Sequence, residues 1–333
     1  MAINSKRLRV TEFDFDNIKE NLKTFLKAQS QFTDYDFEGS GMNILLDTLA
    51  YNTHYLGFNA NMLANEMFLD SASLRSSIVS HAKMLGYEVS SPRAPIATIN
   101  VSLTTSNATA TMSAGTSFNT SVDGVNYQFV TISDITKQNT GNSIPFDSLE
   151  IYEGTFATTK YTVNSSDVDQ RFMLTDIRAD TTTLTVKVQN SSSDTTTTTY
   201  TKATDITQLS SSSTVYFLQE TESGKFEIYF GDGATSKKVE DGNIIILTYV
   251  ITNKTAANGA SSFVRTEAID TVTNISVTTV SNASGGSEAE SSSSIKLNAP
   301  LDYATQGRAV TAEDYKVYQY GVEKMEVSIQ VQV

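Results

Sequence analysis

The sequence contains no cysteine, which excludes disulfide bonds, thiolate metal sites and cysteine nucleophiles. It has two histidines, His54 and His81, so a metal centre built from several histidines is also excluded. Neither histidine is followed four positions later by a second histidine or an acidic residue, as a helical zinc site would require. A packed or solvated side chain is therefore the simpler interpretation for both.

Basic residues and long apolar runs are scarce as well. The 24 Lys and Arg residues face 37 Asp and Glu residues, which gives a formal net charge of −13. Such a charge argues against nucleic acid and against anionic lipid as partners, because both attract basic surfaces. The longest aliphatic run covers residues 244–247, whereas a transmembrane helix needs about 20 apolar residues. Residues 1–11 have no apolar stretch behind their positive charges, so we expect no secretory signal and a soluble protein made inside the cell.

The sequence changes character near residue 90. The 333 residues suggest about two domains. Helical patterns precede the change and strand-like patterns rich in Ser and Thr follow it, with Pro92 and Pro95 between them. The predicted fold class is therefore α+β, with an N-terminal helical bundle segment followed by a β-rich region of antiparallel strands.

Three helices are predicted, over residues 15–29, 40–67 and 73–85. The first has one apolar stripe, and Asp14 or Asp16 can cap its free amides. The second is apolar on two faces and has to be covered on two sides. One face contains Met42, Leu45, Leu46, Leu49 and Leu56, and the other contains Ile44, Tyr51, Tyr55, Phe58 and Met62. The shorter helices could cover one side, while the other needs either the β-rich region or a partner chain. Gly57 permits a break in this helix.

Beyond residue 95 the apolar period is typical of strands. Strands are predicted over residues 96–103, 226–230, 243–251, 261–265 and 272–280, with turns at 223–224, 231–233 and 258–259. Two polar stretches bury too little to be ordered, so residues 191–199 are interpreted as a loop and 281–294 as a linker. A last helix is predicted to start at Thr311, and residues 326–333 alternate like a strand that needs a partner, as if the chain were the front part of something longer.

Two short motifs resemble known ligand sites only in part. Asp34, Asp36 and Glu38 mimic half of a calcium loop, but Leu45 stands where its bidentate glutamate should be, so an acidic turn before a helix is preferred. The sequence GDG at residues 231–233 mimics half of a dinucleotide fingerprint, yet Ser236 replaces its third glycine and a strand pattern follows, which indicates a turn. Neither a nucleophile elbow nor a phosphate-binding loop is present. The residues therefore predict no cofactor, no metal and no enzyme, but a protein built for contacts.

Several sequence strings, taken together and in order, are similar to those of a known family. They are DYDFEGSGMNILLDTLAY at residues 34–51, DSASLRSSIVSHAKMLG at 70–86, AGTSF at 114–118 with DG at 123–124 and FVT at 129–131, YFGDG at 229–233, ANG at 257–259, GG at 285–286 and RAVTAEDY at 308–315. Ser113 stands where the family usually has proline. The chain resembles the baseplate wedge subunits of T-even-like contractile-tailed phages, within the wider baseplate J family.

This resemblance implies a structural role in the virion tail baseplate, after assembly in the host cytoplasm. Such subunits form a heteromeric inner ring around the central hub, and the ring changes shape on host contact and triggers sheath contraction. Two copies associate with a different wedge protein through a helical core bundle, so the implied partners are a second copy, other wedge proteins and, indirectly, the hub, tail tube and sheath. Nucleic acid and membrane are not expected partners. Within the bundle, the periodicity of the helices selects Phe25, Leu26, Leu45, Leu49, Tyr51, Tyr55 and Phe58 as interface residues.

The predicted domain organisation follows from these patterns. It consists of an N-terminal arm (1–12), a helical core-bundle region (13–91), a β-rich domain (92–282) with a loop insertion near 190–200, a linker (283–300) and the start of a C-terminal α/β domain (301–333). Two other functions stay open at this point. The Ser and Thr excess also suits a secreted or surface-exposed β-rich adhesin, and the many carboxylates could serve a glycan hydrolase.

Overall fold

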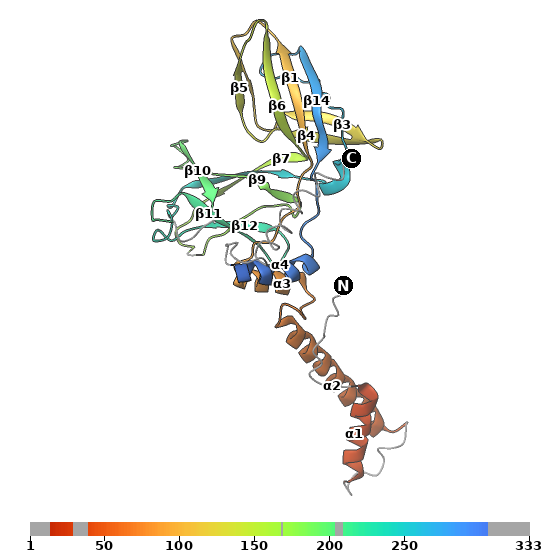
Figure 1. Cartoon of the computed structure of the whole chain (residues 1–333). Helices are drawn as coiled ribbons and strands as arrows, with labels where there is room; N and C mark the ends of the chain where they lie inside the picture. The colour runs from red at the N-terminus through yellow and green to blue at the C-terminus, as the bar shows by residue number, and fades with distance from the viewer. Residues whose placement is uncertain (1–13, 29–38, 168, 204–208, 306–333) are drawn as a thin grey trace. The chain divides into compact units, whose positions relative to one another are not determined.

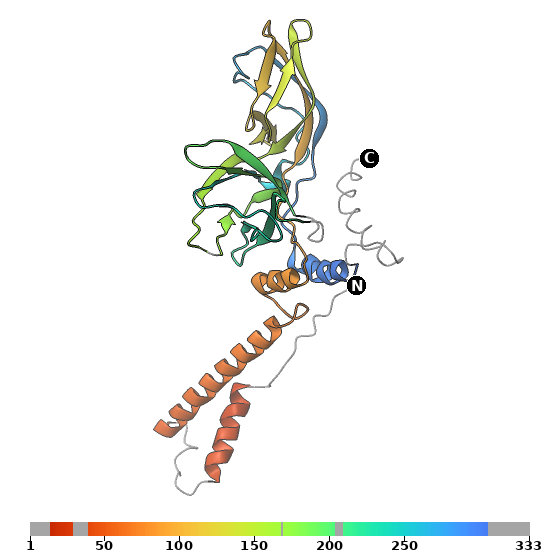
Figure 2. The same cartoon turned by 90° about the vertical axis from the view of Figure 1, so that its left-hand side faces the viewer.

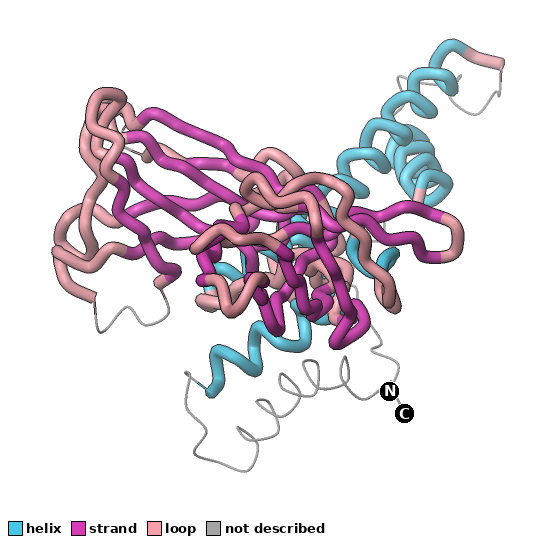
Figure 3. The backbone as a smooth tube through the Cα atoms, turned by 90° about the horizontal axis from the view of Figure 1, so that it is seen from above, coloured by secondary structure: helices cyan, strands magenta, loops and turns pink. Residues whose placement is uncertain are grey.

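The computed structural model describes residues 14–28, 39–167, 169–203 and 209–305. The chain divides into two compact units, Met1–Met84 and Leu85–Val333 (Figure 1). The described part of the first unit is mainly helical, and in the described part of the second unit strands predominate over helices, as the colours of Figure 3 show. The predicted α+β class is therefore confirmed.

The described residues of the first unit form three helices close to the predicted ranges. They are α1 (Phe15–Lys27), α2 (Gly41–Glu66) and α3 (Arg75–Met84). Asp14 occupies the N-cap position of α1, but its side chain makes no capping hydrogen bond, so Asp14 is not the predicted cap, and Asp16 lies in the first turn. The break that Gly57 would permit does not occur, and α2 is one continuous helix of 26 residues. An interior glycine destabilises a helix by only about 1 kcal/mol, which a helix of this length tolerates.

In the described part of the second unit the chain forms the strands, one 3-10 helix and one α-helix. The strands are β1 (Ile96–Thr104), β2 (Thr109–Met112), β3 (Ser117–Val122), β4 (Val125–Val130), β5 (Ile135–Gln138), β6 (Ser143–Glu153), β7 (Thr155–Thr162), β8 (Phe172–Met173), β9 (Ala179–Gln189), β10 (Thr197–Lys202), β11 (Val215–Glu220), β12 (Phe226–Phe230), β13 (Ile244–Ile251) and β14 (Ile275–Ser284). The helices are η2 (Lys254–Ala257) and α4 (Ser292–Thr305).

These strands form three sheets. One has five strands in the order β14-β1-β6-β4-β3, one has seven in the order β7-β13-β9-β10-β11-β12-β8, and β2 pairs with β5. The pairing is antiparallel, as predicted, except between β10 and β11. The strand predicted over residues 261–265 is wrong, since the segment makes one isolated bridge, from Val264 to Asn119. The guanidinium of Arg265 donates to the carbonyl of Ser117 (Nη1 to O, 2.6 Å), so a side chain and not the backbone binds β3 at that residue.

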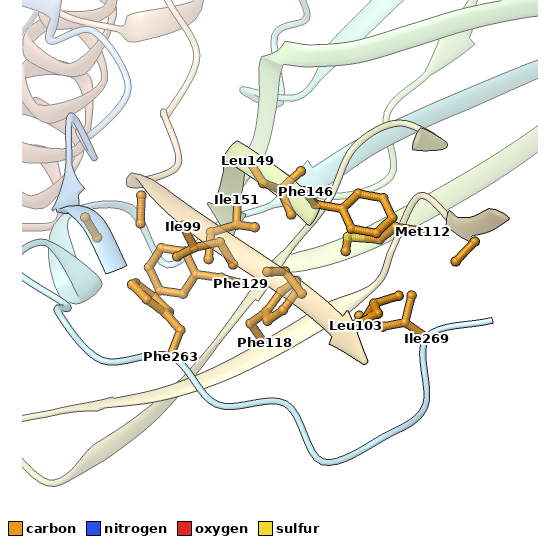
Figure 4. Packing of buried hydrophobic residues seen from close by; sticks show 14 of the residues in the cluster. Ile99, Leu103, Met112, Phe118, Phe129, Phe146, Leu149, Ile151, Phe263 and Ile269 are labelled. Atoms are coloured by element: carbon orange, nitrogen blue, oxygen red, sulfur yellow. The ribbon is translucent and has the colours of Figure 1, made fainter. Parts of the chain in front are cut away.

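Each large sheet has its own apolar core. Along β1, buried and partly exposed residues alternate, which is the period-two pattern expected for a strand with one face on a core. Figure 4 shows this core, in which Phe129 and Phe263 meet edge to face with ring centroids 4.9 Å apart. The second core lies on the seven-stranded sheet and includes the buried rings of Phe172, Phe226 and Tyr249.

Buried polar contacts join the two large sheets. Strand β6 passes into β7 through the single residue Gly154. The fully buried carboxylate of Glu153 accepts hydrogen bonds from Thr252 Oγ1 and from the backbone amide of Asn253, both at 2.8 Å, just after β13 ends. The buried carboxylate of Asp180, at the start of β9, accepts from the backbone amide of Ala94 at 2.8 Å. Because these carboxylates are paired, they can remain buried where the sheets meet.

The predicted linker is largely ordered structure, which corrects the interpretation of residues 283–300. Strand β14 runs to Ser284, and α4 begins at Ser292. The serines that suggested a flexible linker instead start the helix, because Ser291 Oγ accepts from the amide of Ser294. Similarly, the predicted loop at 191–199 ends earlier, since β10 begins at Thr197. The helix predicted at Thr311, the strand at 326–333 and the acidic motif at 34–38 lie outside the described residues.

Candidate functional site

The candidate site is the surface of α2, the longest described helix. Its first turn is capped by Ser40, whose Oγ accepts a hydrogen bond from the backbone amide of Asn43 at 3.1 Å. Asp47 and Glu66 are its only charged residues. A helix with so few charges and this many large apolar residues is poorly solvated by itself and is stabilised by packing against other helices.

One face of α2 is covered within the chain. Its buried residues are Asn43, Leu46, Ala50 and Gly57. Helix α1 packs against α2, as Figure 2 shows, and an ion pair between Lys19 and Asp47 joins the two helices at the edge of this face. The buried residue of α1 is Ile18. The sequence had placed Leu46 in one stripe with Leu45, Leu49 and Leu56, but the structure turns it inward to the covered face.

Two apolar stripes of α2 remain exposed. The aromatic stripe consists of Ile44, Tyr51, Tyr55, Phe58 and Met62. The leucine stripe consists of Leu45, Leu49, Leu56 and Leu63. At about 100° of rotation per residue, the two stripes lie about 120° apart, and the covered face lies about 120° from the aromatic stripe and about 115° from the leucine stripe. The circumference of α2 is therefore divided into three apolar faces, of which α1 covers one.

The exposure of both stripes is large. Tyr51 is 65% exposed, Tyr55 55% and Phe58 60%, and in the leucine stripe Leu63 reaches 69%. The rings of Tyr51 and Tyr55 stack with centroids 6.5 Å apart and planes 14° from parallel, so the aromatic stripe has an ordered surface. Full burial of a side chain of this size contributes about 1.5–3 kcal/mol. Exposed apolar surfaces of this extent are typical of interaction sites, which makes α2 the candidate site of this chain.

The structure places the residues selected from the sequence as follows. Leu45 and Leu49 lie in the leucine stripe, and Tyr51, Tyr55 and Phe58 lie in the aromatic stripe, all exposed. On α1, Phe25 is exposed and Leu26 is half-buried. Whether these seven residues contact partners stays a prediction.

Sequence reasoning missed other exposed members of the same surface. Leu63 was in neither predicted face, although Leu49, Leu56 and Leu63 recur every seven residues, a spacing that could have revealed it. Met67 and Phe68, just beyond the end of α2, are also exposed. The apolar surface thus extends along the whole helix.

A carboxylate fixes the corner between α2 and α3. Glu66 ends α2, and its Oε1 accepts from the amide and the hydroxyl of Ser73, both at 2.8 Å, while the amide of Leu74 also donates to it. Partial burial opposes the charge of Glu66, but these hydrogen bonds prevail and lower its pKa from 4.5 to about 2. The ring of His81 lies 2.8 Å from the carbonyl oxygen of Glu66, which gives this histidine a structural partner. These hydrogen bonds, together with the attraction between the Glu66 carboxylate and the N-terminal end of the α3 dipole, therefore hold α3 at a defined angle to the end of α2.

Features of other kinds of site are not found in the described residues. No group of three or more His, Asp or Glu side chains there could hold a metal ion. Among the described helices, none combines the length and apolarity that crossing a membrane requires. Gly231–Gly233 follow β12 as a turn, as predicted, in which Asp232 Oδ1 accepts from the amides of Ala234 and Thr235.

Comparisons with known proteins point to one family. A family model described as baseplate wedge protein gp6-like, helical domain, matches residues 14–87. A second, described as bacteriophage baseplate wedge protein gp6, third domain, matches residues 158–260. The baseplate wedge protein gp6 of Enterobacteria phage T4 is 31% identical over 338 residues, which cover 91% of this chain and 49% of that protein. The chain thus spans about half the length of this curated relative.

A solved structure is also similar over much of the chain. It is the cryo-EM structure of the anti-feeding prophage baseplate, in which one chain is 11% identical and matches 90% of this chain and 54% of its own length. The TM-score of this match is 0.29, a value at which the two chains are not shown to share a fold.

Proposed function

Because the chain belongs to the gp6-like family of phage baseplate wedge proteins, we propose that it is a structural component of the wedge, with α2 at the centre of a bundle formed with partner chains. Its location is the tail baseplate of the virion. The observation that carries the proposal is the pair of exposed apolar stripes on α2. Relation to a structural protein favours a role in assembly over a role in catalysis.

The geometry of α2 supports a bundle in which two further helices join α1. Three apolar faces about 120° apart are what a helix surrounded by three neighbours requires. Neither stripe contains a charged residue that would be costly to bury. Of the two charged residues of α2, Asp47 is paired with Lys19, and Glu66 accepts hydrogen bonds at the corner with α3. The two outer neighbours would be a second copy of this chain and a different wedge protein.

The different chemistry of the stripes supports two kinds of neighbour. The leucine stripe repeats every seven residues, which suits knobs-into-holes packing against a similar helix. The aromatic stripe presents flat rings, which supply much of the energy at interfaces between unlike chains. Through these contacts the chain would belong to the inner ring of the baseplate and pass on the change of shape that precedes sheath contraction. Because the hydrogen bonds of Glu66 fix the angle between α2 and α3, a movement of α2 would be passed on to α3.

The proposal can be tested by copurification from assembled tails. Replacement of both Tyr55 and Phe58 by alanine removes two anchors of the aromatic stripe and should abolish recovery of the partner wedge protein with this chain. Thr53→Ala is the matched control, because Thr53 is exposed on α2 outside both stripes. Unchanged recovery in the double variant, with the control intact, would show that the aromatic stripe is not the interface. Absence of the chain from tail particles would overturn the proposed function as a whole.

A further inference from the structure

The β3–β4 hairpin projects from the five-stranded sheet. Its strands pair in register from Ser117–Val130 to Val122–Val125 across a two-residue turn at Asp123 and Gly124. Strand β4 pairs with β6 only at Phe129 and Val130, so the outer part of the hairpin is a two-stranded ribbon that extends past the sheet (Figure 1). A ribbon of this kind is marginally stable by itself and gains from a third strand or a covering surface.

The outward face of this ribbon carries uncharged hydrogen-bonding groups. Asn119 lies directly opposite Gln128, and Ser121 lies directly opposite Asn126, so the four side chains share one face. All four residues are exposed. Among the described residues, no partner is found for these three carboxamides and this hydroxyl. Together they offer donors and acceptors in two rows, about 6.8 Å apart along the strands.

These side chains line an open hollow of about 770 Å³. One wall is the segment that contains Ser262 and Val264, and Val264 is 56% exposed. Val264 exchanges backbone hydrogen bonds with Asn119, at 2.8 and 2.9 Å. Because alternate residues of an antiparallel strand direct their backbone groups to the same side, Ser121 directs its N–H and C=O to that side too. No described residue is paired with the backbone of Ser121 there.

We propose that this hollow binds an extended, uncharged polypeptide segment of another subunit of the particle. The lining residues carry no formal charge, so neither an ion nor a nucleic acid is favoured. Two rows at the repeat of an extended strand suit a polypeptide backbone, whose donors and acceptors recur every two residues. Natural sheets usually protect such edges with lysine, proline or bulges. Here the only charged residue between Phe118 and Phe129 is Asp123, in the turn.

The site is separate from α2, but its partner is expected within the same particle, so the proposal rests in part on the proposed function. The test places a photo-crosslinking residue at Ser121 of the full chain in assembled particles, with the same residue at Tyr55 as the probe of α2. Asn282, an exposed residue of β14 in the same sheet, serves as the matched control position. We expect the probe at Ser121 to yield one defined peptide, uncharged and extended, from another particle protein, and the probe at Asn282 not to yield it.

A substitution distinguishes recognition from mere proximity. Asn126→Asp places a carboxylate among the carboxamides at little change of shape, and it should lower the adduct yield from Ser121 about tenfold, since a buried unpaired charge costs more than a lost neutral hydrogen bond. Asn282→Asp makes the same chemical change outside the hollow and should leave the yield unchanged. Equal thermal melting of both variants excludes loss of the fold.

The other outcomes overturn the inference. If Tyr55 crosslinks to a partner and Ser121 does not, the hollow is not a docking site while the proposed function stands. If neither position crosslinks, both fail. A carbohydrate adduct at Ser121, or a yield insensitive to Asn126→Asp, would show that the hollow does not recognise a polypeptide in the way proposed here.

Discussion

Replacement of Gly154 by alanine is expected to destabilise the β-rich unit much more than replacement of Gly124 by alanine. Both glycines have positive φ, +128° at Gly154 and +81° at Gly124, so an alanine is conformationally strained at either position. Their surroundings differ. A Cβ at Gly124 would meet no atom within 4 Å, whereas a Cβ at Gly154 would overlap the carbonyl oxygen of Ile251 and lie 2.8 Å from Cγ1 of Val250.

The magnitude follows from these two contributions. Strain alone costs about 1 kcal/mol at Gly124. At Gly154 the overlap adds about 1–3 kcal/mol, because the obstructing atom belongs to the backbone at the end of β13 and cannot rotate away. The total for Gly154→Ala is then about 3 kcal/mol, a substantial part of the 5–15 kcal/mol that a typical domain has. The difference of about 2 kcal/mol between the variants reports the close approach of β6–β7 to β13 together with the larger departure of Gly154 from the left-handed helical φ.

The assay is equilibrium unfolding of the full chain in urea, followed by the circular dichroism of the strands. With a slope of about 2–3 kcal/mol per M, the midpoint of Gly154→Ala should lie about 0.7–1 M below that of Gly124→Ala. Equal midpoints would refute the reasoning, since they would mean that the backbone at Ile251 yields to an added methyl group at no cost. A changed slope would instead indicate altered compactness and would require a second probe.

Three further predictions concern polar contacts. Stability of the helical unit should fall as the pH is lowered from 4.5 towards 2, because the unfolded state binds a proton at Glu66 more readily than the folded state does, and Glu66→Gln should remove this part of the pH dependence of helix melting. Tyr87→Phe should cost about 1.5 kcal/mol in urea unfolding, since the hydroxyl of Tyr87 donates to both carboxylate oxygens of Glu290, at 2.9 and 3.0 Å. Ser40→Ala should lower the free energy of unfolding by about 1 kcal/mol and increase hydrogen exchange at the backbone amide of Asn43, because this amide donates a hydrogen bond to the hydroxyl oxygen of Ser40.

Much of the fold could be predicted because local patterns report burial directly. The alternation in residues 96–103 gave β1 with nearly its observed bounds, because one face of that strand rests on the core. For residues 261–265 the alternation predicted a strand wrongly, since it could not reveal that the backbone pairs with β3 only at Val264 while the Arg265 side chain binds the carbonyl of Ser117. The prediction of a linker before α4 was wrong for a related reason. Glu290 in this segment accepts hydrogen bonds from the hydroxyl of Tyr87 and the amide of Ser90, about 200 residues away in sequence, and low hydrophobicity alone could not indicate this.

The candidate site, too, could be predicted from the sequence only in part. Periodicity identified α2 as a helix with more apolar surface than one neighbour can cover, and it selected residues that the structure leaves exposed. Periodicity could not decide which face of α2 is covered within the chain, because Leu45 and Leu46 are equally apolar and differ only in direction. Likewise, no pattern in the sequence could show that Asn119, Ser121, Asn126 and Gln128 share one face, because their register depends on the turn at Asp123 and Gly124. The sequence by itself determined the elements and their apolar content, which depend on neighbours along the chain. Only the tertiary structure decided which surfaces stay open, because exposure depends on what packs across space.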